Sequence, residues 1–249
     1  MNMSNAYTVN TNNATKHKIE LYATPVHPCS YFPEKSAITL YLDPYYPKNN
    51  RLYSFLTEKG FRRSGEFLYR PDCDGCEQCI SVRVNVHHFK PRRNQRRILK
   101  KNQDLSITVT SPVYRQAHFD LYKKYVQTRH NGTSMDNPSP SEYEDFLCNQ
   151  WSKGSFYEFR LQDKLIAVAV IDPLEHGLSA IYTYFDPDYA SRSLGAFVIL
   201  WQIQEAQRLD LPWVYLGYWI KDCQKMAYKT NYQPLEYFYQ QNWHPLPPK

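Results

Sequence analysis

Three cysteines lie close together, in the sequence Cys73-Asp-Gly-Cys76-Glu-Gln-Cys79. Thiolates are soft ligands, and a set of four suits tetrahedral zinc or an iron–sulfur cluster. Cys29 would supply the fourth if the N-terminal part of the chain folds back onto this loop. The spacing therefore predicts a zinc or iron–sulfur site at Cys29, Cys73, Cys76 and Cys79. The alternative is a reduced surface loop that binds no metal.

A strongly basic segment follows the cysteine loop. No acidic residue lies between Glu77 and Asp104, and eight of the thirty Lys and Arg residues fall in residues 83–101. Such clustering is typical of a surface that binds phosphates, although a charge run is often only a solvated face. The eight cations are Arg83, Lys90, Arg92, Arg93, Arg96, Arg97, Lys100 and Lys101.

The segment Tyr215-Leu-Gly-Tyr-Trp-Ile220, followed by Lys221 and Asp222, is the densest group of rings and hydrogen-bonding side chains. We expect a strand that ends at Gly217 and presents the following residues at an open edge of a sheet. Asp186 follows another expected strand and is a second candidate for this site. The alternatives are that these rings belong to the core and that Asp186 only stabilises a turn.

Composition limits the class of protein. The chain has 249 residues, of which 42% are hydrophobic, so it can bury a core and is not a disordered chain. Its longest apolar run, residues 165–171, is far shorter than the roughly 18 residues that a membrane helix needs. The first twenty residues are polar and lack the apolar core of a secretory signal. We therefore expect a cytoplasmic protein, no membrane partner, and cysteines that are thiols or metal ligands.

The first half of the chain is expected to form a flexible tail over residues 1–18 and a small α+β unit over 19–110, which carries the cysteine loop and the basic segment. Alternating apolar residues predict strands, and a helix ends before Gly60. The predicted strands are 38–42, 61–69, 80–86 and 105–110, and the predicted helix is 52–59.

Residues 111–249 are expected to form a separate catalytic domain. We predict one helix over 114–129 and a second, short helix that begins at a Ser141 cap, with Glu144 at the capping-box position. Two further helices are predicted, over 194–209 from a Ser193 cap and over 223–230. The predicted strands are 156–162, 164–171, 178–185 and 213–217. This order is typical of a GCN5-type N-acyltransferase core. The predicted fold is therefore α+β, a GCN5-type core with a small N-terminal cysteine-bearing unit.

Acyl-CoA enzymes of that type hold a pyrophosphate with a loop of the form [RQ]-x-x-G-x-[GA] at the start of a helix. The corresponding residues here are Arg192-Ser-Leu-Gly195-Ala-Phe197. Phe197 stands where a small residue should let the backbone approach a phosphate. A CoA-dependent acetyltransferase is therefore disfavoured.

Several short motifs along residues 20–243 resemble the arginyl-tRNA–protein transferase family, and most closely its compact bacterial branch, the aspartate/glutamate leucyltransferases. One departure is Ile80-Ser81, since the family leads us to expect a proline near Ser81. The motifs are His27-Pro-Cys-Ser-Tyr31, Tyr69-Arg-Pro71, Arg83-Val84, Arg96-Arg97, Ser193-Leu-Gly195, Tyr215-Leu-Gly-Tyr-Trp-Ile220, Met226-Ala-Tyr-Lys229 and Pro234-Leu-Glu236.

The resemblance implies an enzyme of the N-degron pathway. It would move leucine from Leu-tRNA onto a protein that begins with Asp or Glu and so mark that protein for degradation. Eukaryotic relatives bind an iron–sulfur cluster in the cysteine unit, whereas the chemistry itself requires no cofactor. Two alternatives stay open: Arg-tRNA as the donor, or a non-catalytic zinc or iron–sulfur module that binds RNA.

The family reaction is attack by a protein α-amine on an ester, and the amine, with an ordinary pKa of about 7.7–8.0, needs no strong base. We expect Tyr218 or a nearby backbone N–H to stabilise the oxyanion, and Asp186 or Asp222 to relay the proton. The acidic substrate side chain needs a cation, for which we consider Arg83, Lys229 and His27. The transfer RNA phosphates are assigned to Arg92, Arg93, Arg96, Arg97, Lys100 and Lys101.

Overall fold

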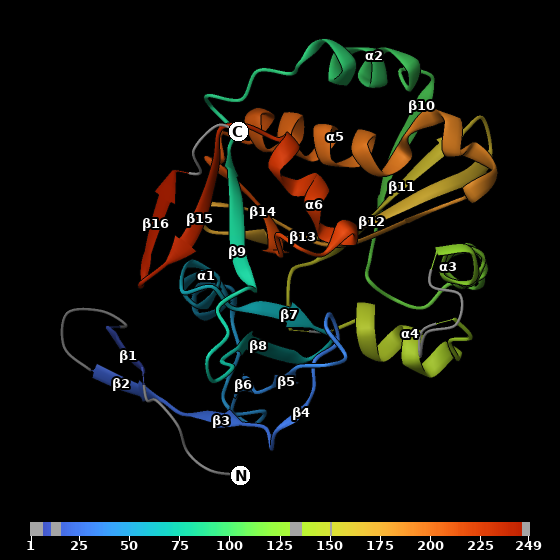
Figure 1. Cartoon of the computed structure of the whole chain (residues 1–249). Coiled ribbons are helices and arrows are strands. Elements are labelled where there is room, and N and C mark those ends of the chain that lie inside the picture. Colours follow the sequence, from blue (N-terminus) through green and yellow to red (C-terminus); the bar gives the residue numbers. More distant parts are fainter. Residues whose placement is uncertain (1–6, 11–15, 130–135, 150, 246–249) are drawn as a thin grey trace.

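The computed structural model describes residues 7–10, 16–129, 136–149 and 151–245. Its largest element is a mixed eight-stranded sheet in the order β10-β11-β12-β13-β14-β9-β15-β16 (Figure 1). The strands are β9 (Ile80–Asn85), β10 (Leu105–Thr110), β11 (Ser155–Leu161), β12 (Lys164–Leu174), β13 (Gly177–Phe185), β14 (Trp213–Trp219), β15 (Leu235–Tyr239) and β16 (Asn242–Pro245).

The antiparallel meander β11-β12-β13 forms because its strands are strongly apolar and joined by tight turns. Leu161 pairs with Lys164 around the predicted turn, in which Gln162 has a left-handed φ of 53°. Residues 166–171 of β12 are all buried, and residues 167–171 contribute alternately to two hydrophobic clusters, one on each face of the sheet. The predicted strands 156–162, 164–171 and 178–185 are therefore confirmed, each with shifts of a few residues at its ends.

Helices cover both faces of this sheet. On one face α5 (Leu194–Arg208) packs against the sheet, and α2 (Arg93–Lys101) packs on α5 (Figure 1). On the other face lie α3 (Gln116–Arg129) and α4 (Pro140–Leu147), whose apolar residues form an aromatic cluster with β12 and β13. Within the described ranges, no helix is long and apolar enough to span a membrane.

Two predicted helix caps differ from the structure. Helix α4 is capped by Ser139 with Glu142, two residues before the predicted Ser141 and Glu144, because Pro140 fits the first helical position. Ser193 does precede α5, but it has a left-handed backbone with φ 55° and its side chain makes no capping hydrogen bond.

Strands β13 and β14 are parallel and then separate. Only three residue pairs join them, the last being Ser179 with Tyr215. On its other edge β14 pairs with β9 from Trp213 to Trp219, with a bulge between Tyr215 and Gly217, whose φ is +78°. The predicted strand end at Gly217 is wrong, since the bulge only bends the strand, which continues to Trp219. The separation leaves space between the two strands for a side chain from another element.

The N-terminal part forms a four-stranded sheet in the order β3-β6-β8-β7 with one helix against it. The single strand predicted over 61–69 is instead a hairpin, because Gly65 turns with φ +53° and has no room for a side chain beside the Asp145 carbonyl. These elements are β3 (Leu21–Ala23), β6 (Thr39–Leu42), α1 (Asn50–Glu58), β7 (Arg62–Ser64) and β8 (Phe67–Pro71).

Two short hairpins complete this part. β4 (His27–Pro28) pairs with β5 (Ser36–Ala37), and β1 (Tyr7–Asn10) pairs with β2 (Lys16–Ile19). Of the tail expected over residues 1–18, residues 1–6 and 11–15 lie outside the described part of the chain.

The sheet does not follow the boundary expected between residues 110 and 111. β9 and β10 precede that boundary but are strands of the eight-stranded sheet, and in Figure 1 β9 lies between β14 and β15. The cause is antiparallel pairing, in which the buried Val84 of β9 faces Val214 of β14 and completes the same core. The basic segment also belongs with this half, as helix α2 on α5.

Candidate functional site

The Arg62 side chain occupies the place where β13 and β14 separate. Its Nη1 donates to Ser179 Oγ at 3.1 Å and its Nη2 to the Ala180 carbonyl at 2.6 Å, both on β13. On the β14 side it lies against Gly217, where a built β-carbon would be 3.1 Å from the guanidinium. Arg62 comes from β7, so this one side chain connects the N-terminal sheet with both strands.

The charge of Arg62 is not balanced by any carboxylate in the described part of the chain. The neighbouring buried carboxylate, Asp172, is already bound by Arg63, whose Nε and Nη2 lie 2.5 and 3.2 Å from its oxygens. Asp172 also accepts a hydrogen bond from the Tyr53 hydroxyl at 3.0 Å. Within the described residues no Asp or Glu forms an ion pair with Arg62, although its side chain is buried.

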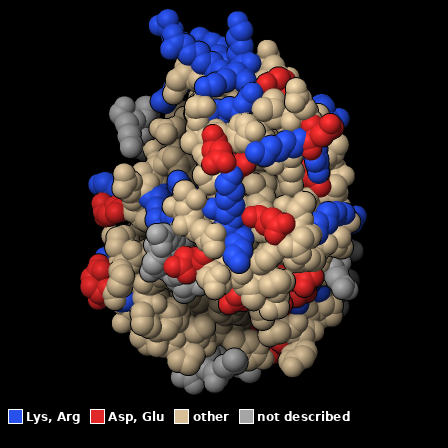
Figure 2. Space-filling view, turned by 90° about the vertical axis from the view of Figure 1, so that its right-hand side faces the viewer, with Lys and Arg blue, Asp and Glu red and all other residues tan. Residues whose placement is uncertain are grey.

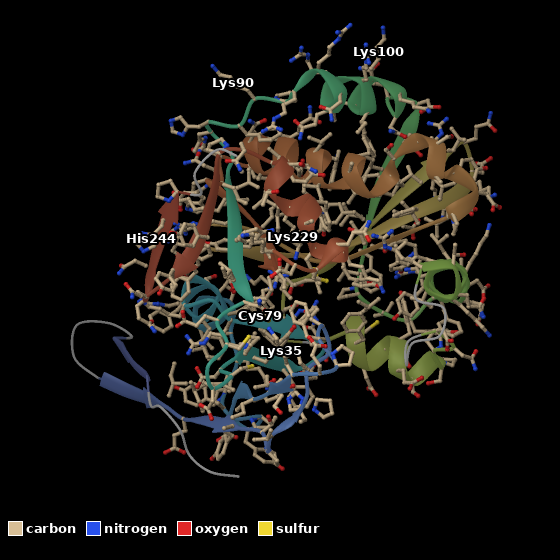
Figure 3. All side chains as sticks on the ribbon, viewed as in Figure 1. Lys35, Cys79, Lys90, Lys100, Lys229 and His244 are labelled. Carbon is tan, nitrogen blue, oxygen red and sulfur yellow. The ribbon has the colours of Figure 1, made fainter. Side chains whose placement is uncertain are left out.

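Lys229 is a second buried cation beside Arg62. It lies in the turn that follows β14 and the short helix α6 (Gln224–Ala227), and its amine donates to the Tyr218 carbonyl. Burial, followed by repulsion from Arg62, lowers the pKa of Lys229 to about 7. No described carboxylate pairs with it either. Figure 3 shows Lys229 inside the molecule, between the Cys79 region and α5.

The hydroxyl of Tyr218, expected at the oxyanion, is directed elsewhere. It donates to backbone carbonyls, with Gly60 O at 3.1 Å and Tyr69 O at 3.3 Å as acceptors. Burial raises the pKa of this hydroxyl well above its ordinary value. Its position is that of a structural residue that holds the loop before Arg62.

Tyr182 on β13 has a buried hydroxyl with no hydrogen-bond partner among the described residues. Its ring centroid lies 5.2 Å from that of Phe146. Burial raises the pKa of Tyr182, and the nearby Tyr228 adds to this increase. Burial also raises the pKa of Tyr228, and the nearby Arg62 opposes that increase. Tyr182 was not predicted as a site residue from the sequence. Its position on the strand expected over 178–185, which ends beside Asp186, could have identified it.

Arg83 already forms ion pairs with carboxylates of this chain. Its Nε lies 2.9 Å from Glu236 and its Nη1 lies 2.9 Å from Glu58. The guanidinium is also stacked between the rings of Trp213, at 3.7 Å, and Trp243, at 4.2 Å. Both carboxylates come from this chain, so the arrangement does not support Arg83 as a reader of the substrate. It joins β9, α1 and the β15–β16 hairpin.

Asp186 is almost completely buried and holds the loop before α5. Burial would raise its pKa, but hydrogen bonds from Lys124, the Asp188 backbone and Lys164 lower it below the ordinary value. The Lys124 amine lies at 2.5 Å and that of Lys164 at 3.3 Å. Asp186 is six residues beyond Ala180 on β13, about 20 Å along an extended strand. This distance separates it from the Ala180 carbonyl that Arg62 binds.

The two remaining predicted residues are not gathered with Arg62 and Lys229 by any contact. Asp222 is exposed in the turn after β14, and Gln78 donates to it at 3.5 Å. His27 lies in the small β4–β5 hairpin, where its Nε2 is 3.4 Å from the Thr39 hydroxyl.

The predicted cysteine ligands gather near one another. Burial, followed by the nearby Cys29, Cys73, Cys76 and Cys223, raises the pKa of Cys79 to about 12. The Cys29 sulfur accepts a hydrogen bond from a backbone amide at 3.5 Å. No group of three or more His, Cys, Asp or Glu side chains in the described ranges is arranged to hold a metal ion. The cysteine site stays a prediction, and no step of the reaction is assigned to a metal.

Helix α2 carries an exposed basic face. Its Arg92 cap position is closed by Gln95, whose side chain accepts from the Arg92 amide at 2.8 Å, and Gln95 itself is buried. Figure 2 shows the Lys and Arg side chains gathered over α2 at the top of the molecule, and Lys100 points away from the helix in Figure 3. All six predicted phosphate-binding residues are exposed: Arg92, Arg93, Arg96, Arg97, Lys100 and Lys101.

Among solved structures, the chain is similar to "The structure of L-PGS from Bacillus licheniformis", with a TM-score of 0.46 and 12% identity over 61% of this chain and 50% of that chain. A TM-score below 0.5 does not establish a shared fold. Sequence comparison is far more informative. The family models "Arginine-tRNA-protein transferase, N terminus" and "Arginine-tRNA-protein transferase, C terminus" match residues 27–97 and 117–239.

Curated proteins of Pseudomonas aeruginosa (strain LESB58) and Pseudomonas putida (strain W619) are similar over nearly their whole length. Both are named aspartate/glutamate leucyltransferase, and each is 50% identical over 226 residues, which are 91% of this chain and 96% of the relative. Two family models in the expected order and this identity lead to one conclusion. The chain belongs to the arginyl-tRNA–protein transferase family, in its aspartate/glutamate leucyltransferase branch.

Proposed function

We propose that this chain transfers leucine from Leu-tRNA to proteins that begin with Asp or Glu, which marks them for degradation in the N-degron pathway. The observation that carries the proposal is its 50% identity with curated aspartate/glutamate leucyltransferases over nearly the full length of both chains. Charged tRNA is a cytoplasmic substrate, so the proposed reaction takes place in the cytoplasm.

The reaction balances without a cofactor. The substrate α-amine attacks the leucyl carbonyl, an amide C–N bond forms, and the ester C–O bond breaks. The ribose hydroxyl of the tRNA leaves and takes up the proton that the amine has lost. Because that amine has an ordinary pKa of about 7.7–8.0, a sufficient fraction is neutral near pH 7, and positioning supplies most of the acceleration.

The exposed cations of α2 support an approach of the tRNA over this helix. The six side chains project from one short helix, so they can follow neighbouring phosphates without rearrangement of the fold. Lys101 also donates to the Ser191 carbonyl at 2.6 Å, which links α2 to the loop before α5. A tRNA held on α2 would thus lie on the same half of the molecule as β13 and β14.

For the oxyanion we propose the Tyr182 hydroxyl, in place of Tyr218. A buried hydroxyl without a partner is costly, and a developing oxyanion would supply the missing acceptor. The Tyr218 hydroxyl already has carbonyl acceptors. We expect Tyr182→Phe to lower kcat about 10- to 100-fold, and Tyr218→Phe to act on stability more than on kcat.

We also propose that the catalytic half is a GCN5-type N-acyltransferase core. In support, the meander β11-β12-β13 is followed by α5 and then by β14, which is parallel to β13. β13 and β14 separate after three residue pairs and the Arg62 side chain fills the space between them, so we propose that the acyl donor is held beside this side chain.

One assay tests the function. Purified protein is mixed with radiolabelled Leu-tRNA, Arg-tRNA or acetyl-CoA and with peptides that begin with Asp, Glu, Gln or Lys. We expect label from Leu-tRNA alone, on the Asp and Glu peptides alone. Transfer from Arg-tRNA would change the donor, and no transfer to an acidic peptide from any donor would reject the proposal.

A further inference from the structure

We propose that Arg62 and Lys229 together bind the carboxylate of the substrate's N-terminal Asp or Glu, with Arg62 as the residue that decides specificity. This inference rests on the proposed function for the identity of the substrate. Neither the sequence motifs nor the names of the relatives assign any role to Arg62.

The site carries two buried positive charges. Arg62 and Lys229 are 8% and 5% exposed, and they lie near each other because Arg62 packs against Gly217 while Lys229 donates to the carbonyl of the adjacent Tyr218. In the part of the chain that the structure describes, neither forms an ion pair with a carboxylate. A buried charge is costly unless it is paired, and two like charges side by side increase that cost. A fold that keeps both cations therefore gains from an anion supplied by a ligand.

The free hydrogens of Arg62 match a carboxylate. Arg62 uses one N–H of Nη1 and one of Nη2 on β13, which leaves its Nε hydrogen and one hydrogen on each Nη. A planar carboxylate matches this remaining set, and bidentate Arg–carboxylate pairs are among the stronger interactions in proteins. Lys229 adds a point charge that can follow either the shorter Asp or the longer Glu side chain.

The two cations lie near the group that we propose for the oxyanion. Arg62 contacts Ser179 and Ala180, and Tyr182, whose hydroxyl has no partner among the described residues, follows two positions later on the same strand. The proposed carboxylate site is thus two residues along β13 from the proposed oxyanion donor. In a peptide that begins with Asp or Glu, the side-chain methylene carbons are only two or three bonds from the α-amine. One site can therefore hold the side-chain carboxylate and present the amine for reaction.

The other cations considered for this role are otherwise engaged. Arg83 is bound by Glu58 and Glu236, and a substrate carboxylate would have to displace both. His27 lies in a hairpin of its own and contacts Thr39. Arg62 is thus the buried arginine in the described ranges that is close to the opened strands and lacks a carboxylate.

The experiment measures binding and transfer separately. Peptides that differ only in an N-terminal Glu or Gln are titrated into the full chain by calorimetry, for wild type, Arg62→Gln and Arg62→Lys. Arg70→Gln is the matched control, since it removes a neighbouring positive charge that interacts with Asp72 at 3.6 Å. Thermal unfolding of each variant shows that it is folded.

We expect Arg62→Gln to weaken binding of the Glu peptide more than tenfold while binding of the Gln peptide is unchanged, and Arg62→Lys to recover part of the difference. Arg70→Gln should retain the wild-type ratio. The proposal is overturned if Arg62→Gln keeps the wild-type ratio of Glu to Gln peptide affinity, or if wild type itself does not prefer the Glu peptide. It is also overturned if the only change in Arg62→Gln is a higher KM for Leu-tRNA, which would assign Arg62 to a tRNA phosphate. A preference for Glu without any transfer of leucine would instead reject the proposed function.

Discussion

The Arg62 guanidinium lies against Gly217, so close that a β-carbon on this glycine would be 3.1 Å from Cζ, Nε and Nη2 of the arginine. Gly217 is also the bulge of β14, with φ +78°. One residue therefore bends the strand away from β13 and leaves the space that the arginine fills. The cation between the two strands depends on the absence of a side chain at position 217.

Gly217→Ala should therefore move the guanidinium as well as strain the backbone. We expect kcat/KM for an acidic peptide to fall at least tenfold, with a loss of about 1–2 kcal/mol in stability from the left-handed alanine. The matched control is Gly75→Ala, since Gly75 has φ +68° but nothing within 4 Å of its β-position. Equal losses of activity in the two variants would show that strain alone is responsible.

Arg83 should be important for stability and not for substrate choice. Arg83→Met leaves Glu58 and Glu236 without their cation, and since both are partly exposed we expect a cost of about 2–3 kcal/mol. Urea unfolding measures this cost, with Arg208→Met as the control because its pair with Glu205 is on the surface. Loss of the preference for Glu over Gln peptides in a folded Arg83→Met protein would contradict this assignment.

Much of the architecture follows from local patterns. The meander, α5 and β14 were predictable because apolar periodicity and turn residues act within short windows, as at Gln162-Asp163. The place of β9 was not, since its pairing with β14 joins residues more than a hundred positions apart. No local signal separates a strand of the N-terminal unit from a strand of the larger sheet.

The candidate site, like the fold, could be predicted from the sequence only in part. Lys229 and Arg83 were both selected as cations within motifs, but only Lys229 lies beside Arg62, whereas Arg83 is paired internally. Arg62 was missed because its neighbour Arg63 has the same charge, and the sequence does not reveal which of the two receives Asp172. Only the arrangement of β7, β12 and β13 decides that Arg63 is neutralised and Arg62 is not.

The reaction should not require a metal. Because the aminolysis balances without a cofactor, we expect leucine transfer to survive prolonged chelation. Metal content is measured before and after treatment, and the rate is followed in parallel. A loss of activity that zinc or iron restores would contradict this expectation and would reinstate the cysteine site as part of the active enzyme.

Binding of Leu-tRNA should depend on salt through α2. If four to six phosphates are contacted, the logarithm of the association constant should fall against the logarithm of the salt concentration with a slope of roughly −3 to −5. Replacing Arg93, Arg96 and Arg97 by Gln should make this slope shallower by about 2 to 3 and leave the KM for the peptide unchanged. Lys153→Gln, an exposed cation elsewhere, is the control. A slope that does not change would remove α2 from the tRNA interface.

Preference for an acidic N-terminus should weaken as the pH rises. Burial and the nearby Arg62 lower the pKa of Lys229 to about 7, so this lysine is charged below pH 7 and increasingly neutral above it. A substrate carboxylate is ionised throughout this range, and its binding therefore includes uptake of a proton by Lys229 above pH 7. We expect the ratio of Glu to Gln peptide affinity to fall about tenfold between pH 6.5 and 8.5. In Lys229→Met the ratio should be lower and independent of pH; a wild-type ratio that stays constant would mean that the lysine charge takes no part in recognition.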